Sequence, residues 1–138
     1  MSKVYDVAIR TPLQHAPKLS KQLKSDVFFK REDLQPVFSF KIRGAYNKIV
    51  QLPEDDRRKG IIAASAGNHA QGVALSAKKL GISALIVMPR TTPAIKIEAV
   101  ESYGAEVVLS GDNYSECAEH CRLLVQTTGR TFIHPYDD

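Results

Sequence analysis

The feature of the sequence that most constrains its fold is a regular alternation of apolar runs with helical patterns between Gly60 and Ile133. Four short apolar runs have the length and composition of buried strands, at 61–64, 82–88, 106–109 and 131–133. Three helical segments are expected between them, at 68–80, 92–103 and 113–128. Strands that alternate with helices cross over with right-handed connections into a parallel sheet. The sequence therefore predicts an α/β fold, a parallel four-stranded sheet with helices on both faces.

The ends of these helices carry signals of their own. Thr92 is expected to cap the second helix with Pro93 as its first residue, and Asn113 with Glu116 forms a capping box for the third. A glycine follows each of the three segments, at Gly81, Gly104 and Gly129. These signals set the expected boundaries within the alternating region.

The first of these strands passes into its helix through Ser65-Ala66-Gly67-Asn68-His69-Ala70-Gln71-Gly72. Backbone N–H groups at a helix N-terminus, together with the positive end of the helix dipole, attract an anion. Gly67 lets the backbone approach a ligand closely, and Asn68 and His69 add polar groups. Because ligands bind at the carboxyl ends of parallel strands, the loop predicts a carboxylate or phosphate site. A capped turn that binds nothing is the alternative interpretation.

The N-terminal part is less regular. A short helix is expected at 17–24 and a strand at 27–29, and the charged residues 30–33 that follow are taken as a solvated strand end. Residues 36–40 are expected to be extended, and a helix is expected at 41–52, stopped by Pro53. The charged residues 53–59 then separate this part from the sheet.

Lys41 begins the expected helix 41–52 and lies off its apolar stripe. The charge of Arg43 and the helix N-terminus both disfavour an ammonium group there, so a neutral amine becomes available for carbonyl chemistry. Lys41 is therefore a candidate nucleophile, and an ordinary surface lysine is the alternative.

Composition excludes several classes of function. The 138 residues carry a net charge of +4, with basic residues scattered among acids, which does not favour nucleic-acid binding. No apolar run approaches the roughly 18 residues of a membrane span, and the start lacks a leader's apolar region, so we expect a cytoplasmic protein.

Cys117 and Cys121 are four residues apart on one helix, where they are poorly placed to bond each other. With His120 they match no zinc pattern, so no metal is expected.

Two long stretches then carry a family resemblance: KREDLQPVFSFKIRGAY at 30–46 and SAGNHAQGVA at 65–74. Together with Val87-Met88-Pro89 and Pro135-Tyr136-Asp137-Asp138, they resemble the threonine dehydratases (threonine ammonia-lyases), which are fold-type II pyridoxal-phosphate enzymes. The first stretch is closer to the biosynthetic, isoleucine-pathway branch than to the degradative one. The resemblance implies a tryptophan-synthase-β-like fold, of which this chain holds the N-terminal part of the catalytic domain.

The resemblance also implies roles for individual residues. Lys41 would hold the aldehyde of pyridoxal 5'-phosphate covalently and then take the α-proton of the amino-acid substrate. Phe40 would pack against the pyridine ring, and Asn68 would hydrogen-bond the ring hydroxyl. The loop made of Ser65, Ala66, Gly67, Asn68 and His69 would bind the substrate carboxylate. The implied reaction converts L-threonine, and also L-serine, to 2-oxobutanoate or pyruvate with release of ammonia.

Ala66 bears on the type of reaction. Serine racemases of the same fold resemble this sequence but carry a second serine where this chain has Ala66, and that hydroxyl serves as acid and base. A methyl group cannot transfer a proton, so elimination is favoured over racemisation. A serine racemase-like enzyme remains one alternative, and an anion-binding α/β module without catalysis remains another.

The chain departs from the family in its glycines. Family members cradle the cofactor phosphate with adjacent glycines, whereas all eight glycines here are isolated. We therefore expect residues 1–52 to belong to an incomplete large domain, and 53–138 to form the small α/β domain. Such a fragment is expected to be inactive alone, while the complete enzyme is expected to be a homo-oligomer.

Overall fold

The computed structural model describes residues 3–137. Met1 and Ser2, part of the start expected to lack a leader, lie outside the described residues, as does Asp138, the last residue of the motif at 135–138. Its elements in chain order are η1 (Lys3–Asp6), β1 (Leu13–His15), α1 (Pro17–Leu23), β2 (Phe28–Lys30), η2 (Glu32–Leu34), α2 (Lys41–Ile49), α3 (Glu54–Lys59), β3 (Ile61–Ala64), α4 (Asn68–Leu80), β4 (Ala84–Met88), α5 (Ala94–Glu101), β5 (Glu106–Leu109), α6 (Tyr114–Thr128) and β6 (Thr131–Phe132).

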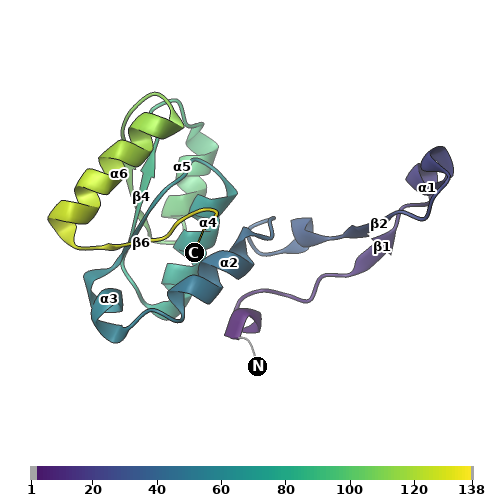
Figure 1. Ribbon diagram of the computed structural model, residues 1–138, viewed down its shortest axis with the longest axis horizontal. Coiled ribbons are helices and arrows are strands. Elements are labelled where there is room, and N and C mark those ends of the chain that lie inside the picture. Colours follow the sequence, from purple (N-terminus) through teal and green to yellow (C-terminus); the bar gives the residue numbers. More distant parts are fainter. Residues whose placement is uncertain (1–2, 138) are drawn as a thin grey trace.

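The main sheet has four strands in the order β5-β4-β3-β6, and every pair in it is parallel. Helix α6 covers one face, and α4 and α5 cover the other (Figure 1). Alternate residues of β3 face opposite sides, as the pleat of a strand requires: Ile61 packs with α4, whereas Ile62 packs with α6. The predicted α/β fold is confirmed.

The two cysteines lie within the layer between α6 and the sheet. Cys117 and Cys121 are both fully buried free thiols, and the thiol of Cys117 donates a hydrogen bond to the carbonyl oxygen of Val87 at 3.1 Å. Burial raises the pKa of the Cys117 thiol to about 11. The pair therefore acts as small core residues, as expected from the sequence.

The helix boundaries are confirmed in part. The Asn113 side chain caps α6 by accepting from the N–H of Glu116, and the Glu116 carboxylate accepts in return from the Asn113 side-chain amide and from the Asp112 N–H, so the predicted cap is present. The prediction for α5 was wrong in detail, since Pro93 rather than Thr92 is the N-cap. The Thr92 hydroxyl instead donates to the carbonyl oxygen of Pro89 at 2.7 Å, which closes the turn after β4. Helix α5 ends before Gly104, and β4 begins two residues later than predicted because the N–H of Ile82 closes the end of α4.

The connection from residue 30 to α3 differs most from expectation. Residues 36–40 are a series of turns rather than extended chain: the N–H of Phe38 donates to the carbonyl oxygen of Gln35 at 2.7 Å, and Phe38 has a φ of 54°. Helix α2 stops at Ile49, short of Pro53. Residues 54–59, for which the sequence predicted only a charged stretch between the N-terminal part and the sheet, form α3, with acids in its first turn and bases in its last.

Helix α2 packs directly on α4, and both contribute to the core above the sheet (Figure 1). The approach is close at Gly72, where an added Cβ would lie 3.2 Å from the carbonyl carbon and oxygen of Lys41. A glycine in α4 therefore lets the first residue of α2 sit against it.

An arm formed by residues 9–35 extends from this body, and Figure 1 shows the antiparallel pair β1-β2 projecting away with α1 at its tip. Every residue of β1 and β2 is exposed. Across residues 3–137, no helix is both long enough and apolar enough to span a bilayer.

Candidate active site

The sheet has a topological switch point beside β3. The chain runs from β3 outward to β4 and β5, and then returns to β6 on the opposite side of β3. In open α/β sheets, ligands bind outside the carboxyl ends of the strands at such a point. Residues 65–67 leave β3 there, and residues 133–137 leave β6 there.

Lys41 reaches the same place from α2. Its Nζ donates a hydrogen bond to the carbonyl oxygen of Pro135 at 2.7 Å. The same Nζ lies 4.8 Å from the centroid of the Tyr136 ring and 5.6 Å from that of Phe40, within the range of cation–π contacts. A cleft of about 920 Å³ opens here, lined by α2, His69 and the residues of β6 and beyond.

The segment after β6 is folded back by His134. Its Nδ1 accepts hydrogen bonds from the backbone N–H groups of Tyr136 and Asp137, at 3.1 and 2.9 Å. This turn directs the Pro135 carbonyl toward Lys41. None of these residues was among the predicted site residues, although their position after the last strand of a parallel sheet was a usable signal.

The loop after β3 continues the sheet by one hydrogen bond, from the Ser65 N–H to the carbonyl oxygen of Val87 at 3.0 Å. The Ser65 hydroxyl accepts from the Gly67 N–H at 3.2 Å. Gly67 is the N-cap of α4 and has no side chain that could cap the helix. The N–H groups of the first turn of α4 have no acceptors within the helix, and Asn68 is exposed beside them. The loop therefore presents backbone donors and one amide, which suit an anion.

The ring of His69 has a structural contact within the chain. The ring is buried, and its Nε2 lies 3.0 Å from the carbonyl oxygen of Ile133. Because a carbonyl oxygen only accepts, Nε2 is the protonated nitrogen. The ring thus ties α4 to the end of β6.

The structure brings three of the predicted site residues to one cleft: Phe40, Lys41 and His69. Ser65, Ala66, Gly67 and Asn68 form the turn just before His69, at the N-terminus of α4. The expected influence of Arg43 on Lys41 lacks support, because the guanidinium of Arg43 pairs with Glu32 through two hydrogen bonds of 2.9 Å. No cluster of three or more metal-ligating side chains occurs among residues 3–137.

A lysine amine at the carboxyl edge of a parallel α/β sheet, near a helix N-terminus whose backbone donors suit an anion, defines a class of domain suited to covalent chemistry with a carbonyl compound. The chain belongs to the family of pyridoxal-phosphate dependent enzymes, whose sequence profile matches residues 4–138. The donor set fits the aldehyde and ring end of that cofactor, because a primary amine and an aromatic ring flank the cleft.

Individual relatives are similar over nearly the whole chain. The chain is 61% identical over 136 residues to the chloroplastic biosynthetic threonine dehydratase of Arabidopsis thaliana, covering 99% of this chain and 23% of the relative. It is 51% identical over 140 residues to the biosynthetic L-threonine dehydratase of Burkholderia multivorans, covering 99% and 28%. The chain thus spans about a quarter of the length of these curated relatives.

Solved structures show the same similarity. The processed form of threonine deaminase isoform 2 from Solanum lycopersicum superposes with a TM-score of 0.94 at 52% identity, covering 99% of this chain and 38% of that one. Maize serine racemase superposes with a TM-score of 0.93 at 36% identity, covering 99% and 41%. The fold of this chain is therefore that of fold-type II pyridoxal-phosphate enzymes, in part.

Proposed function

We propose that this chain is the N-terminal part of the catalytic domain of a threonine dehydratase of the biosynthetic type. The complete enzyme would convert L-threonine to 2-oxobutanoate and ammonia, and L-serine to pyruvate and ammonia. The observation that carries the proposal is the position of the Lys41 Nζ, in the cleft that His69 and the end of β6 also line. The names of the relatives that are 51% to 61% identical support the choice of reaction.

The proposed roles follow the chemistry of each side chain. Lys41 would bind the cofactor aldehyde through its amine and, once released by the substrate amino group, accept the α-proton at Nζ. Phe40 would contact the ring, Asn68 would donate a hydrogen bond to its hydroxyl, and the backbone of 65–69 would bind the carboxylate. Pyridoxal phosphate, when bound, supplies an electron sink for the carbanion.

The phosphate of the cofactor needs further residues. All eight glycines of the chain are isolated, so no glycine run is present to cradle a phosphate. We therefore propose that residues 1–52 belong to a large domain, that 53–138 form the small domain, and that this chain alone shows little turnover. A homo-oligomer and the cytosol are proposed for the complete enzyme, although the Arabidopsis relative is named chloroplastic.

A serine racemase-like activity is the second candidate, because maize serine racemase has nearly the same fold. Ala66 argues against it, since its methyl group cannot exchange a proton on the face of the substrate opposite Lys41. Chiral chromatography after incubation of the complete enzyme with L-serine separates the two: we expect pyruvate without D-serine. If D-serine formed as fast as pyruvate, racemisation would replace dehydration as the proposed activity.

The cofactor assignment is tested by reduction with borohydride in the presence of pyridoxal phosphate, followed by peptide mapping of the complete enzyme. We expect the label on Lys41. Lys48 lies on the same helix and lines the same cleft, so a Lys48→Ala variant that keeps the label is the matched control. A label on a different lysine in the unmodified enzyme would remove the proposed role of Lys41.

A further inference from the structure

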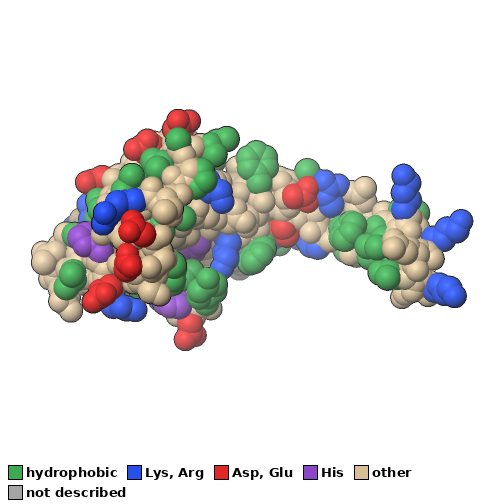
Figure 2. Space-filling view, turned by 90° about the horizontal axis from the view of Figure 1, so that it is seen from above, with side chains coloured by type: hydrophobic (Ala, Val, Ile, Leu, Met, Phe, Trp, Pro, Cys, Tyr) green, Lys and Arg blue, Asp and Glu red, His purple; other side chains and the backbone are tan. Residues whose placement is uncertain are grey.

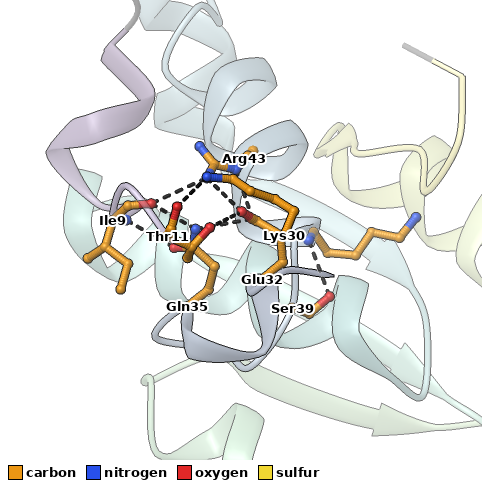
Figure 3. Close-up of polar contacts among 8 residues, drawn as sticks. Ile9, Thr11, Lys30, Glu32, Gln35, Ser39 and Arg43 are labelled. Carbon is orange, nitrogen blue, oxygen red and sulfur yellow. Dashed lines mark hydrogen bonds and ion pairs between the residues drawn. The ribbon is translucent and has the colours of Figure 1, made fainter. Parts of the chain in front are cut away.

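A second polar cluster lies at the base of the arm, on the side of α2 away from the cleft. The carboxylate of Glu32 accepts four hydrogen bonds: from Thr11 Oγ1 at 2.5 Å, from Gln35 Nε2 at 3.1 Å, and from Nε and Nη2 of Arg43 at 2.9 Å each (Figure 3). A carboxylate has about four lone-pair sites, so Glu32 is fully satisfied. We refer to Thr11, Glu32, Gln35 and Arg43 as the Glu32 cluster.

The Glu32 cluster joins three segments of the chain. Gln35 forms two hydrogen bonds of 2.9 Å with the backbone N–H and carbonyl of Ile9, and Arg43 Nη2 also donates to the Ile9 carbonyl at 3.3 Å (Figure 3). Residues 9–11 enter the arm, residues 32–35 leave it, and Arg43 belongs to α2. The base of the arm is thereby bonded to the first turn of α2.

The charged pair within the cluster is largely withdrawn from water. The side chains of Glu32 and Arg43 are 17% and 27% exposed, and Gln35 and Thr11 are almost fully buried. The hydrogen bonds from Arg43 are the main reason that the pKa of Glu32 falls to about 2. A buried ion pair adds little net stability compared with apolar residues, but its hydrogen bonds have strict directions.

Few local hydrogen bonds orient the first turn of α2. The N-cap, Phe40, has no polar side chain, the Ser39 hydroxyl accepts from the Lys41 N–H at 3.3 Å (Figure 3), and the preceding turns include Phe38 in the left-handed region. The backbone of Lys41 contacts Gly72 of α4 on one side. Arg43 is two residues further along, and residues two apart in a helix project from different sides. The first turn of α2 is therefore held between α4 and the Glu32 cluster.

We propose that Glu32 and Arg43 are positioning residues that orient the first turn of α2 and so place the Nζ of Lys41 in the cleft. The inference rests on the proposed function of Lys41. Because a misplacement of about 1 Å costs roughly 100-fold in rate, even a small rotation of α2 is enough to slow reaction at Lys41.

The test measures how fast pyridoxal phosphate labels Lys41 in the complete apoenzyme, with borohydride trapping and peptide mapping. The label on Lys79, an exposed lysine of α4 outside the cleft, serves as an internal reference in the same molecules. We expect the ratio of Lys41 to Lys79 labelling rates to fall roughly 10- to 100-fold in Glu32→Gln and in Arg43→Gln. Arg43→Lys keeps the charge but loses the planar fork, so we expect a smaller fall in the same direction.

The double variant Glu32→Gln/Arg43→Gln separates positioning from the avoidance of an unpaired buried charge. If positioning is correct, the double variant labels Lys41 as slowly as either single variant. A return to the rate of the unmodified enzyme would overturn the inference, as would unchanged ratios in the single variants and in Arg43→Lys.

Asp33→Asn is the matched control, because it breaks an exposed Arg31–Asp33 pair in the same element, and we expect it to leave the ratio unchanged. Failure of the unmodified enzyme to label Lys41 would overturn the proposed function and this inference together, whereas normal labelling with insensitive variants would overturn the inference alone.

Discussion

The body of the molecule and its arm are held together by different forces. Each residue of β3 and β4 is buried, and apolar side chains from α4 and α6 pack on the two faces of the sheet. In the arm, each residue of β1 and β2 is exposed, including Leu13 at 64% and Phe28 at 51%. Figure 2 shows green apolar side chains on the surface of the arm and blue basic ones at its tip.

Apolar packing dominates in the body, whereas directional hydrogen bonds hold the arm. Apolar burial stabilises the body strongly, but it is non-directional. The arm has almost no such burial and is tied to α2 by the hydrogen bonds of the Glu32 cluster, whose directions are strict. Lys41 lies where these two kinds of structure meet, with Gly72 of the body against its backbone and Arg43 of the cluster two residues away.

The largest effect is expected at this junction. Lys41→Ala in the complete enzyme should lower kcat for L-threonine by at least about 1,000-fold, because the proposed proton acceptor is removed. The Tm should change little, since the side chain makes a single hydrogen bond, to Pro135. Ketoacid formation and differential scanning calorimetry measure the two quantities. Residual turnover near that of the Lys48→Ala control would contradict the role of Lys41.

Two substitutions that shorten a side chain test the difference between the body and the arm. Ile86→Ala in β4 should lower the free energy of unfolding by about 2–5 kcal/mol, because Ile86 is fully buried and its loss leaves a cavity. Phe28→Ala in β2 should change it by only about 0.5 kcal/mol, since Phe28 is half exposed. Urea denaturation measures both values. Equal losses would mean that the arm also depends on apolar packing.

The ion pair in the Glu32 cluster should make the stability of the chain depend on pH. The pKa of Glu32 is lowered from 4.5 to about 2 in the folded chain, so the ionised cluster contributes stability above pH 4.5. That contribution should be lost as the pH falls from 4.5 through about 2. We expect urea midpoints at pH 6 and pH 3 to differ less in Glu32→Gln than in the unmodified chain. Asp33→Asn should retain more of the difference, and identical pH profiles for Glu32→Gln and the unmodified chain would refute the assignment.

A small effect is also expected within the body, at a local cap. Asn113→Ala removes the acceptor for the Glu116 N–H and should cost about 1 kcal/mol in the free energy of unfolding. Asn113→Ser keeps an acceptor for the Glu116 N–H without placing a second carboxylate beside Glu116, so it should be nearly neutral. Denaturant titration of both variants measures the difference. A loss as large as that of Ile86→Ala would show that local caps matter as much as the core.

Local chemistry explains which parts were predictable. The strands at 61–64 and 106–109, the helix at 68–80 and the Asn113 cap were predicted correctly, because each depends on residues within one turn or one strand. The turns at 36–40 and helix α3 were missed, because the first depends on a buried Gln35 and the second on charge order in a short segment.

By itself, the sequence determined the order of strands and helices in the body, the place of Lys41 at the start of α2, and the loop at the N-terminus of α4, since these are local patterns. Only the tertiary structure decided how the site is closed. The Lys41–Pro135 hydrogen bond joins residues 94 apart, the His69–Ile133 contact joins residues 64 apart, and the Gln35–Ile9 hydrogen bonds join residues 26 apart. Such contacts form only when the sheet brings distant segments together, and no local pattern of side chains encodes them.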